Sequence, residues 1–171
     1  MVILRPTRKL YRDLRPVLEP VARSDTALGD WYVNRLVVDR RPLLLMVSST
    51  SLLSLLIPAR HVSSLPSQLP TLVGSRLRRL GVEEVLIRAE IASMTPTVVA
   101  PTTDRSVMGS IVDFAKNIPY YLEIGGWDET TLPFVEARLA ETPCRVARRF
   151  EEVVFPQTDA PRLLAARWHA A

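Results

Sequence analysis

The stretch "WYVNRLVVDRRPLLLMVSSTSLLSLLIP", from Trp31 to Pro58, decides the fold that we predict for this chain. Its first part is rich in β-branched and aromatic residues, "RRP" interrupts it, and an apolar run follows, which is typical of a β-hairpin. Pro42 is compatible with the second strand because the first residue of a strand need not donate a hydrogen bond. The run that ends at Pro58 is either a third strand or one to two helical turns, since a short apolar run does not reveal its period.

Two amphipathic helices follow this region. Apolar residues at three- and four-residue steps predict a helix that ends before Gly81, a residue type common at helix C-termini. The segment 82–94 predicts a second helix that forms a hairpin with the first. Its predicted buried face consists of Val82, Val85, Leu86 and Ala89.

Further elements are expected on either side of these segments. Short strands are predicted at residues 2–5 and 97–100, and a short helix within residues 8–20. An apolar stripe at helical spacing predicts a helix from about residue 104 to residue 122, which Pro119 is expected to kink or end. The stripe consists of Val107, Ile111, Phe114, Ala115, Ile118 and Leu122.

The chain of 171 residues is the length of one ordinary domain. We expect an α+β domain over residues 1–150, in which a small, mostly antiparallel sheet packs against several helices. Residues 151–171 are expected to form a C-terminal extension with an edge strand and a short helix. The single cysteine, Cys144, excludes an internal disulfide.

Location and partners follow from hydropathy and charge. The longest apolar run, residues 42–56, is interrupted by hydroxyl residues and is shorter than the about 20 residues that cross a bilayer, so we expect no membrane segment and a cytoplasmic location. The net charge of +4 permits nucleic acid as a partner beside protein. Nearly all cations are arginines, a bias typical of a GC-rich genome, which weakens the charge argument. Homo-oligomerisation stays open.

The usual catalytic motifs are missing from the sequence: there is no Walker loop, GxGxxG, HExxH, paired CxxC or GxSxG. We therefore predict no cofactor and no metal site. His61 follows Arg60, which would disfavour imidazolium and leave a neutral base. A solvated loop histidine is the competing interpretation.

The polar stretch "PTTDRSVMGSIVDFAKN" begins the helix predicted after residue 104. Thr103 or Asp104 can cap that helix by accepting hydrogen bonds from its first amides. Arg105 opposes the positive end of the helix dipole, so we expect it to be partnered or used. The first interpretation is a salt bridge from Arg105 to Asp30 or Asp113, and the alternative is an anion site that Arg105 forms together with Thr103 and Ser106.

A second polar cluster, "ALGDWYVNR", precedes the hairpin. Gly29 permits a tight turn and Asp30 can bond its own following backbone. Trp31 is either a core residue or a stacking and docking residue. Asp30, Asp104 and Asp113 could also supply oxygen ligands to a hard cation.

With "LGDWYVNRLVVDRRPLLLMVSSTSLLSLLIP", "TTDRSVMGSIVDF" and "LAETPC", the sequence resembles a family of uncharacterised bacterial proteins, a domain of unknown function. The resemblance implies an LGDWY-type hairpin and a later helix that starts with Asn or Asp followed by RSVxGS. It places Gly109 where another backbone could approach closely. The site residues that it implies are Gly29, Asp30, Trp31, Arg105, Ser106, Gly109, Asp113 and Phe114.

From these patterns we expect a non-catalytic binding module that engages a protein partner or nucleic acid. The resemblance to proteins of bacterial genomes and plasmids implies an accessory or antitoxin-like element of a mobile locus. The alternative is a phosphate-substrate enzyme, such as an RNase or nucleotide-processing enzyme, with Arg105 as phosphate clamp and Asp113 or His61 as base. Both rest on one geometric hypothesis, that Arg105, Asp30 and Asp113 converge on one hollow.

Overall fold

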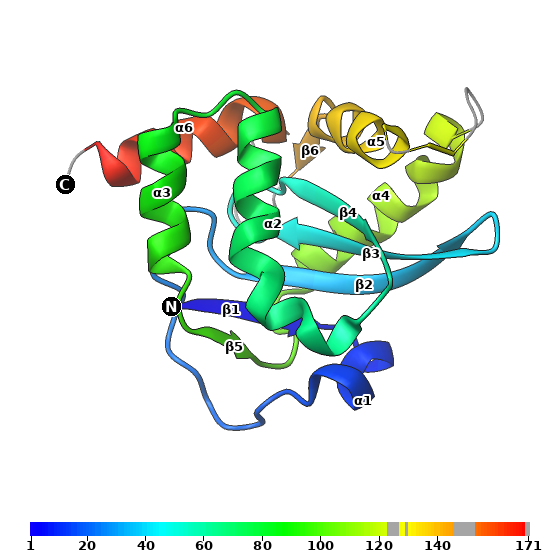
Figure 1. The fold of residues 1–171 in the computed structure, drawn as a ribbon, viewed down its shortest axis with the longest axis horizontal. Helices are drawn as coiled ribbons and strands as arrows, with labels where there is room; N and C mark the ends of the chain where they lie inside the picture. Colours follow the sequence, from blue (N-terminus) through cyan, green and yellow to red (C-terminus); the bar gives the residue numbers. More distant parts are fainter. Residues whose placement is uncertain (123–126, 129, 146–152, 170–171) are drawn as a thin grey trace.

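A computed structural model describes residues 1–122, 127–128, 130–145 and 153–169 of the chain. A five-stranded mixed sheet with the strand order β4-β3-β2-β1-β5 lies at its centre (Figure 1). The strands are β1 (Val2–Pro6), β2 (Trp31–Val38), β3 (Arg41–Ser48), β4 (Ser54–Pro58) and β5 (Thr97–Val99).

The predicted meander forms the antiparallel half of this sheet. β2 pairs with β3 from Trp31 opposite Ser48 to Val38 opposite Arg41, and β3 pairs with β4 in the same sense. β1 lies parallel to both β2 and β5. The expected α+β fold is confirmed, as is the third strand, while the parallel strands extend the sheet beyond the meander.

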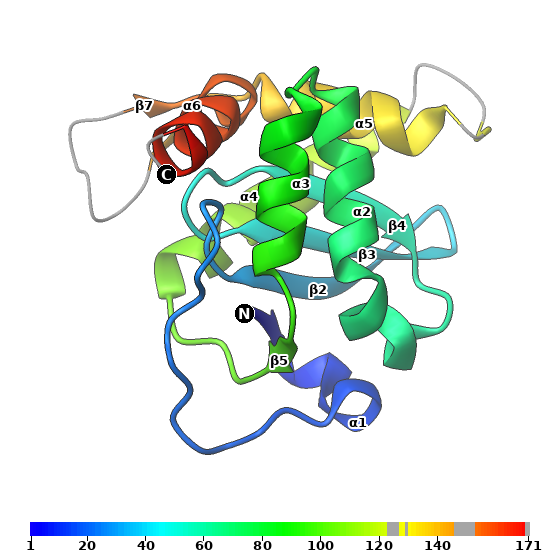
Figure 2. The same ribbon diagram turned by 60° about the vertical axis from the view of Figure 1, so that its left-hand side comes forward.

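Helices cover both faces of the sheet (Figures 1 and 2). α2 (Leu65–Arg79), α3 (Glu84–Ser93) and α6 (Pro156–Trp168) lie on one face. α4 (Arg105–Leu122) and α5 (Thr131–Ala140) pack against the other. A 3-10 turn, η1 (Arg8–Leu10), and the short α1 (Tyr11–Leu14) follow β1, and a second 3-10 turn, η2 (Val62–Ser64), precedes α2.

The two faces explain why β3 reads as an uninterrupted apolar run. Leu44 and Met46 enter the core beneath α2 and α3, whereas Leu43, Leu45 and Val47 enter the core beneath α4. Side chains alternate between faces along a strand, so a strand covered on both sides needs apolar residues at every position.

Two helix predictions need correction. In α3 the buried residues are Leu86, Ile87 and Glu90, while Val85 is exposed, so the predicted face was rotated toward solvent. Pro119 neither ends α4 nor prevents its last turn, because the helix continues to Leu122. Pro119 lacks a backbone N–H and so removes one intrahelical hydrogen bond, which the helix tolerates. The predicted apolar stripe of α4 is buried except for Ala115, which is partly buried.

The C-terminal part of the chain packs onto the α3 side of the molecule. β6 (Cys144–Arg145) pairs with β7 (Val153–Val154), and α6 follows directly. Glu151 and Glu152 of the predicted edge strand lie outside the described residues. Ala160 and Leu164 of α6 are buried in the core that α2 and α3 share.

In the described part of the chain, none of the helices has the length and apolar character that spanning a bilayer requires.

Candidate binding pocket

A pocket of about 550 Å³ lies where four segments meet: the loop before β2, the end of β3, the loop before α4, and the β7–α6 segment. Its lining is mostly polar. The hydroxyl groups come from Ser24, Thr26, Tyr32, Ser49, Thr50 and Thr103. The charged groups come from Arg23, Asp30, Asp104, Asp159 and Arg162.

Asp30 is held by contacts of both its side chain and its backbone. Its carboxylate forms an ion pair with the Arg5 guanidinium and accepts a hydrogen bond from Ser24 Oγ at 2.6 Å. Its backbone N donates to Ser49 Oγ at 2.9 Å. Gly29 makes this approach possible, because its φ is +70° and a Cβ there would lie 2.4 Å from Ser49 Oγ. The carboxylate is therefore fixed in place and largely neutralised by Arg5.

Tyr32 connects β2 to the start of α4. Its hydroxyl accepts a hydrogen bond from Asp104 N at 3.1 Å and lies 3.2 Å from Thr103 Oγ1, to which it can donate. Asp104 Oδ1 in turn accepts hydrogen bonds from Ser106 N at 2.9 Å and Ser106 Oγ at 2.7 Å. The predicted capping role of Asp104 is confirmed, and the Ser106 hydroxyl is used inside the cap.

The remaining wall comes from α6. Arg162 Nη2 donates to Asp159 Oδ1 at 2.6 Å, and Asp159 Oδ2 accepts from Phe155 N at 2.9 Å. Arg23, on the opposite loop, is exposed and makes no ion pair or hydrogen bond with the described residues. The guanidinium of Arg23 is thus the lining cation that is open to a ligand.

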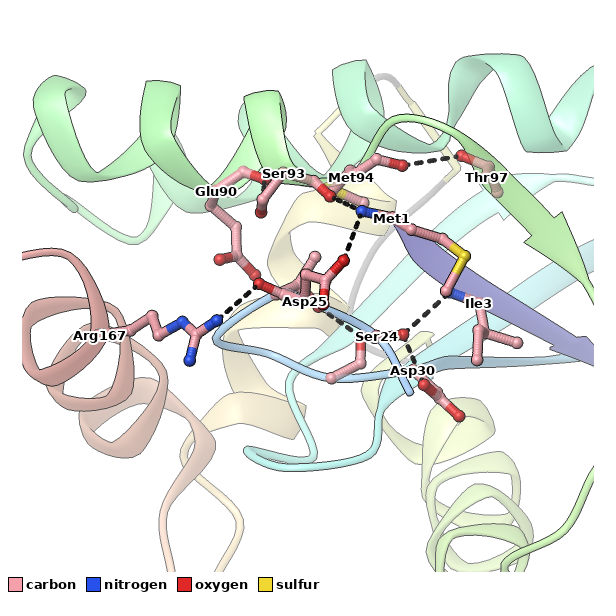
Figure 3. A network of polar contacts seen from close by, with 12 residues as sticks. Met1, Ile3, Ser24, Asp25, Asp30, Glu90, Ser93, Met94, Thr97 and Arg167 are labelled. Carbon is pink, nitrogen blue, oxygen red and sulfur yellow. Dashed lines mark hydrogen bonds and ion pairs between the residues drawn. The ribbon is translucent and has the colours of Figure 1, made fainter. Parts of the chain in front are cut away.

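Figure 3 shows how the loop that carries Ser24 is attached to the sheet. Ser24 Oγ accepts a hydrogen bond from Ile3 N at 3.0 Å while it donates to Asp30. Asp25 N donates to Met1 O at 2.9 Å, and Arg167 Nη2 of α6 donates to Asp25 O at 3.3 Å. These contacts hold β1, the loop and α6 together on one side of the pocket, although the segments are far apart in sequence.

The structure brings only part of the predicted site together. Asp30, Thr103 and Asp104 line the pocket. Trp31 is fully buried among the core residues under α2 and α3, so the docking interpretation of this indole is wrong and the core interpretation holds. The Trp31 Nε1 group has no hydrogen-bond partner among the described residues.

The convergence hypothesis for Arg105, Asp30 and Asp113 is wrong. Arg105 is exposed on the first turn of α4 and forms no ion pair within the described chain. Asp30 pairs with Arg5 instead. Asp113 is also exposed and lies 3.6 Å from Lys116, one turn along the helix. A cation at a helix start can point to solvent, where the helix dipole is screened and its cost is small.

Two other predicted features lie away from the pocket. His61 is exposed in left-handed backbone before η2, on a segment that packs with the α2 side of the sheet. Gly109 has nothing within 4 Å of the position of a Cβ, so no other segment of the described chain approaches this helix residue closely.

Sequence reasoning missed several residues of the pocket and its floor: Arg5, Arg23, Ser49, Asp159 and Arg162. One signal was present for Arg5, since it is the charged member of the apolar strand "VILRP", and a buried cation requires a partner. The others lie in loops or on a helix surface, where a single sequence does not show which residues face a common space.

In the described ranges, the acidic, histidine and cysteine side chains form no group of three that could hold a metal ion. Asp30 and Asp104 share the pocket, but Asp113 does not. The three-aspartate cation site considered from the sequence is therefore not assembled.

Comparison with known families places the chain. The family described as Domain of unknown function (DUF6933) matches residues 3–159. The chain belongs to this family. The matched region runs from β1 to the first turn of α6, so it includes the pocket wall up to Asp159 and leaves out Arg162 and Leu163. No curated protein and no solved structure matches the chain significantly.

Proposed function

We propose that this domain is a non-catalytic binding module whose pocket holds a polar side chain of a protein partner. The observation that carries the proposal is the lining itself, in which hydroxyl groups outnumber charged groups. Hydroxyl groups both donate and accept hydrogen bonds, so they match the amide and hydroxyl groups of a peptide segment.

The charges of the pocket favour a protein partner over nucleic acid at this site. Asp30, Asp104 and Asp159 face the same space as Arg23 and Arg162, with Arg5 neutralising Asp30 from below. A phosphate that entered would meet carboxylates as well as guanidinium groups. Sites that bind phosphate concentrate cations and amide donors without opposing carboxylates.

The rim supplies the apolar contact that protein interfaces use. Val154 lines the pocket, and its neighbours Val153 and Phe155 are 50% and 40% exposed. Exposed aromatic and aliphatic side chains around a polar cavity are typical of surfaces that dock another protein. A partner can thus bury these side chains while one of its polar groups enters the pocket.

The alternative, a phosphate-substrate enzyme, requires Arg105 to act with Asp113 or His61 as base. Arg105 and Asp113 are exposed on α4, and His61 precedes the helix on the other face of the sheet. Their placement supports the binding module. A cytoplasmic location, which was expected from the hydropathy, belongs to the same proposal. So does a role as an accessory or antitoxin-like element of a mobile bacterial locus, which rests on the resemblance.

Site-specific photocrosslinking tests this proposal. A benzophenone amino acid at position 23, in the pocket lining, is expected to crosslink the partner in native lysate, whereas the same group at position 105 is expected not to. The partner identified in this way is then purified and titrated against the wild type and two charge-matched variants, Arg23→Glu and Arg105→Glu.

We expect Arg23→Glu to weaken binding at least about tenfold, which is about 1.4 kcal/mol, and Arg105→Glu to leave the affinity unchanged. If Arg105→Glu weakens binding and Arg23→Glu does not, the interaction site is the exposed face of α4 and the pocket proposal fails. If a small molecule co-purifies with the wild type but not with Arg23→Glu, the pocket binds a metabolite and the protein-partner proposal fails.

A further inference from the structure

One end of the molecule carries a concentrated set of cations. The 3-10 turn η1 contacts β2, and α1 contacts η2, so these segments form one surface. Thr7 N donates to Val33 O at 2.9 Å and fixes the start of η1 against the strand. We call this surface the basic end. Its cations are Arg8, Lys9, Arg12, Arg15, Arg35 and Arg60.

All six of these cations are exposed, and none forms an ion pair with a described residue. Of the fourteen other lysines and arginines in the described chain, seven form ion pairs with described residues. Elsewhere, Arg79 pairs with Glu136, Arg138 with Glu141 and Arg162 with Asp159. Unpaired like charges held on one surface repel each other, and a bound polyanion removes that repulsion.

The basic end accounts for the positive charge of the whole chain. The residues that form it, 8–15, 31–38 and 60–64, contain six cations and one carboxylate, Asp13, which is a net charge of +5. The whole chain carries +4, so all other residues together carry −1. The excess positive charge of the chain is therefore concentrated on one surface, which the total charge alone did not show.

We propose that the basic end binds the phosphodiester backbone of nucleic acid without sequence preference. Lysine and arginine side chains that contact phosphates release condensed counterions, and this release drives sequence-independent binding. Guanidinium groups, which five of the six cations carry, bond phosphate oxygens in pairs. α1 lies at the end of the molecule away from α3, α5 and α6, where an extended polyanion can reach it (Figures 1 and 2).

This surface is separate from the pocket. Arg35 lies on the same face of β2 as Trp31 and Val33, because alternate residues of a strand point to the same side. Trp31 and Val33 enter the core under α2 and α3. Tyr32, which lines the pocket, belongs to the opposite face. Binding of nucleic acid at the basic end is therefore independent of the pocket proposal, and each can fail without the other.

Fluorescence anisotropy measures this binding directly. The probes are a labelled single-stranded RNA and a labelled DNA duplex of about 20 nucleotides or base pairs, each titrated between about 50 and 200 mM salt. For the duplex we expect a log-log salt slope of about −3.6 to −5.4, which corresponds to contacts with about four to six phosphates. The double variant Arg8→Ala/Arg12→Ala is expected to weaken binding at least about tenfold at the lower salt and to reduce the slope by about 2.

The matched control is Arg88→Ala/Arg105→Ala, which removes the same charge from exposed helix positions outside the basic end. This control is expected to bind as the wild type does, and thermal unfolding must show that both double variants are folded. Equal losses in the two double variants would mean that binding follows net charge only and would overturn the proposal. Absence of binding at about 50 mM salt would overturn it as well.

Vesicles with and without anionic lipid form the last arm. Binding to anionic vesicles together with no binding to RNA or DNA would assign the basic end to a membrane surface and overturn the nucleic-acid proposal.

Discussion

Glu136 on α5 occupies the open edge of the sheet, where its Oε1 accepts a hydrogen bond from Leu56 N of β4 at 2.8 Å. The same carboxylate accepts a hydrogen bond from Arg79 at 2.6 Å and lies 3.6 Å from Arg76 Nε. Arg76 also donates to Ser54 O of β4 at 3.0 Å. Side chains thus bind the outward backbone groups of β4, which would otherwise be free to pair with another strand.

Replacement of Glu136 by alanine is expected to be severely destabilising. Glu136 is 1% exposed and Arg76 is 2% exposed, so the substitution leaves a buried guanidinium without its carboxylate. Breaking a buried pair in this way costs about 3–5 kcal/mol in the free energy of unfolding. Urea denaturation of Glu136→Ala measures the loss. The control is Glu141→Ala, whose exposed pair with Arg138 contributes below about 1 kcal/mol; similar losses in both variants would contradict the edge-strand role.

The stability of the domain is expected to depend on pH through Glu90. Burial raises the pKa of Glu90 above its ordinary value of 4.5, although Ala27 N, Leu28 N and Trp168 Nε1 donate hydrogen bonds to it. A raised folded-state pKa means that the folded chain binds this proton more tightly than the unfolded chain. The contribution of Glu90 protonation to the free energy of unfolding is therefore complete below the ordinary pKa of 4.5, and it is lost as the pH rises through the folded-state pKa.

Urea denaturation of wild type and Glu90→Gln from about pH 4 to about pH 8 tests this sign. The difference in unfolding free energy, wild type minus variant, is expected to fall as the pH rises, because glutamine does not titrate. Glu84→Gln is the control with the opposite sign, since the hydrogen bond from Arg78 lowers the pKa of Glu84. A difference that stays constant or grows with pH for Glu90→Gln would refute the assignment.

Cys144 is expected to react slowly with thiol reagents in the folded protein. Burial raises the pKa of its thiol to about 11, and the negative charge of Asp113 adds to the effect. At about pH 8 roughly one thiol in a thousand is then ionised, and only the thiolate is nucleophilic. The rate of reaction with Ellman's reagent should rise about tenfold per pH unit up to about pH 10.

Removal of the Asp113 charge is expected to accelerate this reaction. Asp113→Asn favours the thiolate and raises the rate, whereas Asp13→Asn, on the distant α1, leaves the rate unchanged. A rate that levels off near pH 8 to 9, at the pKa of an ordinary free thiol of about 8.5, would show that burial does not control Cys144.

Two glycines are expected to respond to alanine in opposite directions. Gly29→Ala places a Cβ 2.4 Å from Ser49 Oγ at a φ of +70°, so it should destabilise the fold by about 1–3 kcal/mol and open the turn beside Asp30. Gly109→Ala meets nothing within 4 Å on an exposed helix position, so it should stabilise by about 0.5–1 kcal/mol. Thermal unfolding of both variants decides the matter, and a loss in Gly109→Ala would show that another chain or ligand contacts α4.

The sequence predicted the elements of this fold well because their patterns are local. The meander showed its strand boundaries at "RRP" and Pro58, and α4 showed its buried stripe at helical spacing. The face of α3 was predicted less well. Glu90 is buried only because the backbone of residues 27–28 and the Trp168 indole donate to it, and none of these donors is near in sequence.

The candidate site was less predictable than the fold for the same reason. Asp30 and Asp104 were recognised as polar residues at turns, and both line the pocket. The partner of Asp30 is Arg5, which β1 brings beside β2 through parallel pairing of Arg5 with Tyr32. Helix spacing indicated that Arg105 lies on the first turn of α4, but it contained no information about the direction of an exposed side chain.

The position of β1 between β2 and β5 has a consequence for synthesis. β1 pairs with Trp31 to Val33 of β2 on one side and with Thr97 to Val99 of β5 on the other. β1 is synthesised first, but its second neighbour, β5, is synthesised only about 90 residues later. A nascent chain that stops before residue 97 has a hydrogen-bonding edge on β1 with no native neighbour. Ribosome stalling in α2 or α3 would therefore release a fragment prone to self-association.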